Sequence, residues 1–156
     1  MTPAVNCADK AKLLYNLHQY EHDKNAASYG EEAADKLNIS PEQVFKTLVV
    51  ELDSGVLAVS VIPVSGQLNM KLMAAAVKAK KAKMADPKKV ERSSGYVLGG
   101  VSPLGQKKLL KTVIDSRALG FETIFVSAGR RGLEIELSPN DLALVLKASF
   151  AELGKA

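Results

Sequence analysis

Two apolar runs, at 44–52 and 55–63, constrain the fold more than any other feature of the sequence. They read "VFKTLVVEL" and "GVLAVSVIP", and only Asp53 and Ser54 separate them. Both runs are short, rich in β-branched residues and bounded by turn residues, which is typical of buried strands rather than helices. A connection this short predicts an antiparallel hairpin.

Lys46 is the unexpected member of the first run. Side chains alternate between the two faces of a strand, so Lys46 shares its face with Val44, Leu48 and Val50. Two interpretations remain open at this point. The ammonium group either reaches solvent from a strand edge while its stem stays packed, or points into a pocket.

The rest of the chain alternates between helical and extended patterns. Helices are predicted at 2–14, 29–38, 69–80, 86–94 and 138–148, and further strands at 15–20, 111–115, 122–128 and 133–137. Thr2, Asp86 and Ser138 each precede a proline, which is typical of an N-cap followed by the first helical residue. We therefore predict a single α/β domain over residues 1–156, with a mixed sheet in which hairpins exclude a purely parallel arrangement.

The sequence contains features of a soluble cytoplasmic protein. Cys7 is the only cysteine, so no internal disulfide can form and a reducing compartment is expected. The N-terminus lacks the apolar core of a secretion signal, and no stretch reaches the ~20 apolar residues that span a bilayer. We expect no membrane partner.

Positive charge is concentrated in one part of the chain. The window 71–92 holds eight basic residues against Asp86 and Glu91, a charge of +6 in a chain whose total is +4. Such a run can be the solvated face of a lysine-rich helix or the electrostatic footprint of a polyanion site. Two further basic groups lie beside glycines, at 107–111 and 130–131, and together the three favour nucleic acid.

Standard catalytic and cofactor motifs are missing from the sequence. His18 and His22 lack the further ligands that a zinc site needs, and Cys7 on the first helix fits a structural role better than a nucleophilic one. There is no G-x-S-x-G motif. The segment "GVSPLGQK" has glutamine where a phosphate loop needs lysine, and Pro103 removes an amide. We predict no metal and no cofactor.

Four separated segments together resemble one family of enzymes. "QYEHD", "FKTLVV", "GYVLGGVSPLGQKK" and "FVSAGRRGLEIEL" are similar to the YbaK family of aminoacyl-tRNA deacylases, free-standing relatives of the editing domain of bacterial prolyl-tRNA synthetase. The resemblance covers the whole chain and implies a mixed, largely antiparallel sheet or partly closed barrel with surrounding helices. The most similar members hydrolyse cysteine mischarged on proline tRNA. Mischarged tRNA, above all proline tRNA, and prolyl-tRNA synthetase are thus the expected partners.

The resemblance also implies roles for individual residues. Lys46 is the essential side chain of the pocket, and the loop 99–103 presents backbone amides to the ester and the terminal adenosine. The implied substrate-binding residues are Tyr20, Gly99, Gly100, Pro103, Ser127 and Glu134. The basic residues expected to contact tRNA are Lys80, Lys81, Lys83, Lys107, Lys108, Arg130 and Arg131. Family members specific for cysteine use the thiol of the substrate as the nucleophile, releasing tRNA and a thiolactone.

Departures from the family pattern leave alternatives open. Ala128 stands where relatives often carry glycine, and Glu134 is one methylene longer than the usual aspartate, so the pocket is expected to be slightly smaller. Glu134 could instead lie on a solvated strand face, and Tyr20 could be an ordinary aromatic at a strand end. A deacylase with another amino-acid specificity, or a non-catalytic module that binds tRNA or a synthetase, is the alternative function.

Overall fold

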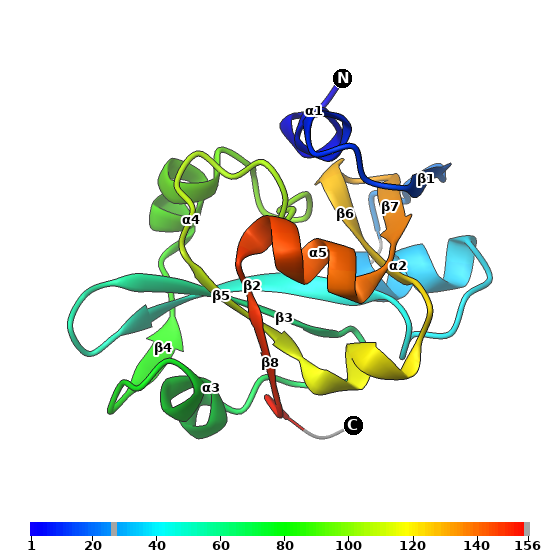
Figure 1. Ribbon diagram of the computed structural model, residues 1–156. Coiled ribbons are helices and arrows are strands. Elements are labelled where there is room, and N and C mark those ends of the chain that lie inside the picture. The colour runs from blue at the N-terminus through cyan, green and yellow to red at the C-terminus, as the bar shows by residue number, and fades with distance from the viewer. Residues whose placement is uncertain (26–27, 155–156) are drawn as a thin grey trace.

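Two β-sheets form the frame of the protein (Figure 1). The computed structural model describes residues 1–25 and 28–154. The smaller sheet is antiparallel throughout, with the strand order β1-β7-β6. Its strands are β1 (Tyr15–Gln19), β6 (Ile124–Arg130) and β7 (Leu133–Leu137).

The larger sheet has five strands and contains both parallel and antiparallel pairs. Its order is β4-β2-β3-β5-β8, for β2 (Phe45–Leu52), β3 (Leu57–Pro63), β4 (Ala82–Met84), β5 (Lys111–Asp115) and β8 (Ser149–Ala151). The strands β4, β2 and β3 pair antiparallel, which confirms the predicted hairpin, and β3, β5 and β8 pair parallel. The predicted α/β class with mixed, largely antiparallel pairing is confirmed, but the strands form two open sheets instead of a partly closed barrel.

Short helices connect and cover the strands. They are α1 (Pro3–Lys10), α2 (Tyr29–Lys36), α3 (Met70–Ala76), α4 (Pro87–Ser94), the 3₁₀-helix η1 (Ser116–Gly120) and α5 (Pro139–Leu146). The N-caps predicted at Thr2, Asp86 and Ser138 are confirmed, each with its proline in the first turn. In the described part of the chain, no helix is both long enough and apolar enough to cross a membrane.

The sequence pattern overestimated two helices and missed three short elements. The helix predicted at 2–14 ends at Lys10, and the one predicted at 69–80 ends at Ala76. Lys12 and Lys78 lie just beyond these ends with φ of 57° and 58°, a left-handed conformation that terminates a helix. The elements β4, η1 and β8 have three to five residues, too few to show a hydrophobic period.

One hydrophobic core joins the two sheets. Phe45, Val49 and Ile114 of the larger sheet belong to the same buried cluster as Val126 and Ile135 of the smaller one. A second cluster fills the opposite face of the larger sheet beneath α3, and a third packs α2 against the start of β2. Both faces of β2 are therefore covered along most of its length, which explains its nearly continuous apolar sequence.

The edge of β2 that faces the smaller sheet is open over part of its length. β4 pairs with β2 only from Val50 to Leu52. The smaller sheet reaches β2 through a single parallel bridge between Val44 and Phe125. From Phe45 to Leu48, no described strand pairs with β2 on this side, and the candidate site lies at this gap.

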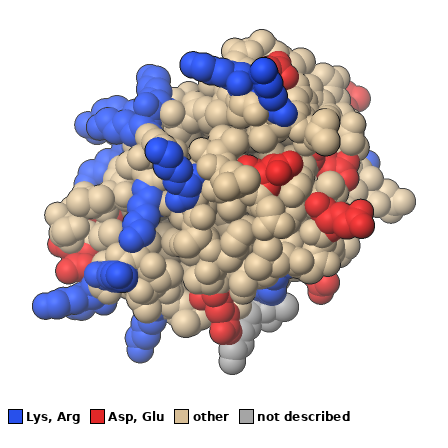
Figure 2. All heavy atoms as spheres, viewed as in Figure 1, with Lys and Arg blue, Asp and Glu red and all other residues tan. Residues whose placement is uncertain are grey.

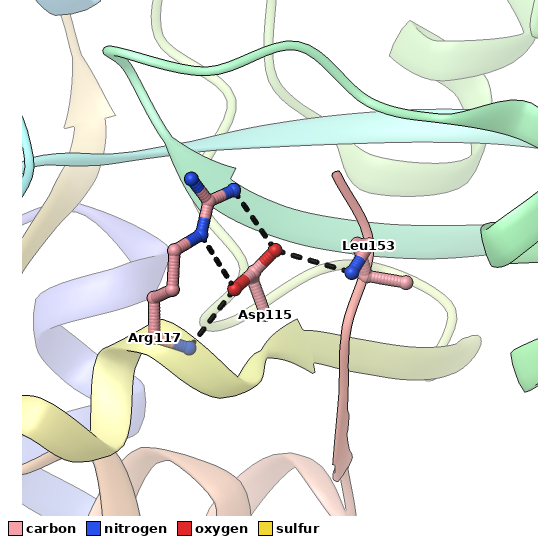
Figure 3. A network of polar contacts seen from close by, with 3 residues as sticks. All are labelled: Asp115, Arg117 and Leu153. Carbon is pink, nitrogen blue, oxygen red and sulfur yellow. Dashed lines mark hydrogen bonds and ion pairs between the residues drawn. The ribbon is translucent and has the colours of Figure 1, made fainter. Parts of the chain in front are cut away.

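A buried carboxylate anchors the C-terminal end of the chain (Figure 3). Asp115 is fully buried and accepts hydrogen bonds from the backbone N, Nε and Nη2 of Arg117 at 2.9, 2.9 and 3.0 Å, and from the Leu153 amide at 3.2 Å. Burial alone would raise the pKa of Asp115, but these hydrogen bonds outweigh it and the pKa lies below its usual value. The network therefore ties the end of β5 to the residues that follow β8.

Candidate active site

A cavity of about 390 Å³ lies between the open edge of β2, the start of α2, the loop 95–105 and the smaller sheet. Aromatic and aliphatic side chains line most of it, together with a few polar groups, as is typical of small-molecule sites. The lining residues are Tyr20, Ser28, Tyr29, Gly30, Phe45, Lys46, Thr47, Leu48, Leu98, Gly99, Val101, Ser127 and Glu134.

Five of the predicted pocket residues meet in this cavity, although they come from four separate parts of the chain. They are Tyr20, Lys46, Gly99, Ser127 and Glu134. Gly100 and Pro103 do not line the cavity, since both are buried in the loop behind it. The structure therefore assembles most of the predicted set, with Val101 in place of Gly100 and Pro103.

Lys46 lies where the apolar packing of β2 ends. Leu48 and Val50, which share its strand face, pack in the cluster beneath α3, whereas Lys46 is partly exposed and lines the cavity. Its ammonium group forms no ion pair or hydrogen bond with the residues that the structure describes. Lys46 thus shares a strand face with buried apolar side chains, but it lies beyond the part of that face that α3 covers and therefore reaches the cavity.

Glu134 is a buried carboxyl group at the cavity, so the solvated strand face considered from the sequence is wrong. Its residue exposure is 6%, and burial raises the pKa of Glu134 to about 8. Its carboxyl group has no hydrogen-bond partner among the described residues. A carboxyl group with this pKa is mostly protonated at neutral pH.

Glu136, two residues further along β7, has the opposite environment. It accepts a hydrogen bond from Thr123 at 2.6 Å and contacts His18 Nε2 at 2.9 Å, and these partners hold the pKa of Glu136 below its usual value. His18 therefore has a structural partner. No group of three or more His, Cys, Asp or Glu side chains within the described residues could hold a metal ion.

Tyr20, which follows the end of β1, and Ser127 on β6 flank Glu134. Burial, followed by the carboxyl group of Glu134, raises the pKa of Tyr20. Ser127 lies directly opposite Glu134 in the β6–β7 register, and its Oγ accepts a hydrogen bond from the Gly129 amide at 3.1 Å. The phenol, the hydroxyl and the carboxyl group thus share one wall of the cavity.

The loop 95–105 forms another wall and packs closely on the β6–β7 hairpin. Gly99 has φ of 92°, in the region that favours glycine. A Cβ at Gly100 would lie 2.8 Å from Cα of Arg130, so only glycine allows this approach. The Gly100 amide donates to the Val97 carbonyl, whereas the amides of Gly99 and Val101 have no acceptor among the described residues. Both residues line the cavity with these amides unpaired in the described part of the chain.

The start of α2 contributes residues that the sequence analysis missed. Tyr29 lies under the guanidinium group of Arg131, whose Cζ is 4.1 Å from the ring centroid, and Arg131 also donates to the Asp23 carbonyl at 3.3 Å. Arg131 thus packs against the wall of the cavity. The only sequence signal for this part of the site is Gly30 in the first turn of a helix, where it lets α2 approach Val64 closely.

Thr47, next to Lys46 on β2, is a further cavity residue that the sequence analysis did not single out. Its Oγ1 is buried without a hydrogen-bond partner in the structure described here, and the residue lines the cavity. Thr47 is the only other polar residue within the apolar run at 44–50. That pattern could have identified it as a site residue.

Basic side chains gather on one side of the molecule. Figure 2 shows them mainly over the region of α4 and β4, while most acidic side chains in the same view lie toward the opposite side. The predicted tRNA-contacting residues that are exposed are Lys80, Lys81, Lys83, Lys107, Lys108 and Arg130. Lys107 packs over Gly95 at the start of the loop, and Arg130 lies against Gly100, so basic groups flank the cavity wall.

Known proteins resemble this chain in sequence. The family model of the aminoacyl-tRNA editing domain matches residues 23–144. The protein named "Putative Cys-tRNA(Pro)/Cys-tRNA(Cys) deacylase EbsC" from Enterococcus faecalis is 34% identical over 152 residues, which cover 97% of this chain and 92% of that protein. The "Uncharacterized protein YwhH" from Bacillus subtilis is 35% identical over 63 residues, or 40% of each chain.

Solved structures share the fold along nearly the whole chain. The "Crystal structure of a putative trans-editing enzyme for prolyl tRNA synthetase" is 20% identical, with a TM-score of 0.83 over 99% of this chain and 96% of that one. The "Crystal structure of hypothetical protein APE2540" is 25% identical, with a TM-score of 0.87 over 98% of this chain and 99% of that one.

Proposed function

The chain belongs to the aminoacyl-tRNA editing domain family and is an aminoacyl-tRNA deacylase; from this premise we propose that it removes cysteine wrongly attached to proline tRNA. The free tRNA is one product. Prolyl-tRNA synthetase is the proposed protein partner, because a solved structure with the same fold is named as a trans-editing enzyme for that synthetase. The proposed location is the cytoplasm, where aminoacyl-tRNA is made and used.

The observation that carries the proposal is the composition of the cavity. Lys46 lines it without an ion pair among the described residues, beside the unpaired amides of Gly99 and Val101. Such donors stabilise the negative charge that develops on an ester oxygen, and one oxyanion donor contributes on the order of 10²–10³ in rate. The described lining residues include no triad of serine, histidine and acid, so positioning and preorganised donors have to supply the catalysis.

The proposed nucleophile is the thiol of the bound cysteine. Its sulfur attacks the ester carbonyl, the new S–C bond closes a thiolactone ring, and the C–O bond to the terminal ribose breaks. The thiol proton ends on the released ribose hydroxyl, and water then opens the thiolactone to cysteine. Holding sulfur and carbonyl together in one cavity supplies the orientation that makes such an intramolecular attack fast.

The exposed basic residues are proposed to hold the tRNA. Lysines that contact phosphates release counterions, so binding becomes weaker as salt increases. A cavity of about 390 Å³ accommodates only the aminoacyl end of the acceptor strand. The rest of the RNA would lie on the basic side visible in Figure 2.

A deacylation assay with proline tRNA carrying cysteine, alanine or proline tests the proposal. We expect the cysteine ester to be cleaved fastest and Lys46→Ala to lose more than ~90% of the activity. Lys36→Ala, which removes an exposed lysine of α2 outside the cavity, is the matched control. Faster cleavage of another ester would make that ester the proposed substrate. No cleavage of any ester would favour a non-catalytic tRNA-binding module.

A serine ester on the same tRNA tests the thiol mechanism. A thiol with a pKa near 8.5 is a few per cent thiolate at neutral pH, whereas a serine hydroxyl is almost entirely protonated. Differences in fit alone discriminate by only ~10–200-fold. Equal rates for the two esters would contradict attack by the substrate thiol and favour a water positioned by Lys46 and the loop 95–105.

A further inference from the structure

The cavity contains one basic and one acidic side chain that do not pair with each other. Lys46 and Glu134 both line it, yet no ion pair or hydrogen bond joins either of them to a residue that the structure describes. Burial is the cause of the raised pKa of Glu134, and no nearby cation offsets it. Each group is therefore free to meet a complementary group on a ligand.

The surroundings of Glu134 leave a cation-binding place open. Ser127 and His18 lie opposite it in the register of the smaller sheet, but the His18 ring is bound to Glu136. The titratable groups around the Glu134–Tyr20 wall are His18 on β1, Tyr20 after β1, Lys46 on β2, Glu32 on α2, Arg131 after β6 and Glu136 on β7. The guanidinium group of Arg131 is held by Tyr29 and the Asp23 carbonyl.

A buried carboxyl group without a hydrogen-bond partner is costly for a protein to keep. An aminoacyl ester brings a cation, the α-ammonium group, two bonds away from the carbonyl carbon that reacts. We propose that Glu134 binds this α-ammonium group, so that the cavity selects esters of amino acids with a free α-amino group. This inference rests on the proposed function, and it names the part of the substrate that the buried acid recognises.

Binding then displaces a proton. At pH 6.5 the free carboxyl group of Glu134 is protonated, since its pKa is about 8, and an α-amino group with a pKa of about 7.7–8.0 is an ammonium ion. When they meet, the carboxyl group becomes a carboxylate paired with the ammonium ion, and one proton passes to solvent. Binding should therefore release close to one proton at this pH.

The test is a calorimetric titration with two ligands that cannot be hydrolysed. One is 3′-cysteinylamino-3′-deoxyadenosine, and the other is its α-hydroxy counterpart, in which a hydroxyl of nearly equal size replaces the ammonium group. Titrations at pH 6.5 in two buffers of different ionisation enthalpy give the affinity and the number of protons released. A hydrogen bond to a charged group corresponds to about tenfold to 100-fold in affinity, so the wild type should prefer the amine by at least tenfold.

Two variants of β7 separate ammonium binding from a general effect on the strand. Glu134→Gln should bind both ligands equally and release no proton, whereas Glu136→Gln should behave as the wild type because Glu136 lies outside the cavity. Thermal unfolding establishes that both variants are folded. Equal affinity of the wild type for the two ligands, failure to bind either of them, or an unchanged preference in Glu134→Gln would overturn the inference.

The proposed function fails by a different result. A chain that binds the amine with proton release but cleaves no cysteine ester would keep this inference and lose the deacylase proposal for cysteine. Cleavage of the ester at normal rates by a chain that binds both ligands equally would keep the deacylase proposal and refute ammonium binding by Glu134. In that case Glu134 would act as a neutral donor to the ester carbonyl, without contact to the amino group.

Discussion

Replacement of Glu134 by glutamine should change how stability depends on pH. The pKa of Glu134 is about 8 in the folded protein and 4.5 in the unfolded chain. Between these values the folded state holds a proton that the unfolded state has lost, so stability falls as pH rises. The contribution of this group is fully present below pH 4.5 and is lost as pH rises through 8.

The size of the effect follows from the difference between the two pKa values. Each pH step of one across this window costs the wild type about 1.4 kcal/mol, because one proton is involved. From pH 4.5 to 7 the loss amounts to about 3 kcal/mol, and over the whole window to about 5 kcal/mol. The amide introduced by Glu134→Gln does not titrate, so the variant should escape this loss.

Urea denaturation of both proteins at several pH values between 4.5 and 8 measures the difference directly. The free energy of unfolding of Glu134→Gln relative to the wild type should rise steadily with pH. Glu136→Gln is the control, since partners lower the pKa of Glu136 and its stabilisation is present above its unfolded pKa and lost as pH falls. A pH-independent difference between Glu134→Gln and the wild type would refute a buried, protonated Glu134.

Three further predictions concern packing, RNA binding and the C-terminal anchor. Gly30→Ala would push a Cβ against Cγ1 of Val64 and should cost about 1–3 kcal/mol; in a double-mutant cycle Val64→Ala should recover part of this cost, and strictly additive values would contradict the contact. A triple variant that neutralises Lys80, Lys81 and Lys83 should raise KM for tRNA more than it lowers kcat, and should flatten the salt dependence of binding. An unchanged KM would place the RNA on another face. Asp115→Ala removes the acceptor of four hydrogen bonds and should lower the free energy of unfolding by about 3 kcal/mol. A variant that unfolds at the same urea concentration as the wild type would disprove this.

Local chemistry explains which parts of the fold were predictable from the sequence. The hairpin formed by 44–52 and 55–63 has a clear β pattern and a short turn, and the three proline-linked caps follow from geometry that a few residues determine. The ends of α1 and α3 were not predictable because lysines, not glycines, take the left-handed conformation there. The division into two sheets depends on long-range pairing, which no local pattern encodes.

Site residues were predictable from the sequence where a polar residue interrupts an apolar strand, or where the residue lies in a motif shared with the family. Lys46 satisfies both conditions. Glu134 satisfies only the second, because its alternation with Leu133 and Ile135 predicts a solvent-facing side chain, and the face is covered only in the folded protein. Thr47 satisfies the first condition, as the other polar residue of the apolar run at 44–50. Tyr29 shows no motif, and its place at the cavity depends on how α2 meets the open edge of β2.

The close contact between the loop 95–105 and the β6–β7 hairpin divides the site into a part that can diverge and a part that cannot. A Cβ at Gly100 would collide with the backbone of Arg130, and a Cβ at Gly129 would collide with the ring of Tyr96. A saturation mutagenesis scan should therefore find both positions nearly intolerant of substitution. The cavity-lining side chains of Lys46, Ser127 and Glu134 lie instead on strands, where exchanging one leaves the backbone in place. New substrate ranges can therefore arise through strand substitutions while the amide-bearing loop is inherited unchanged.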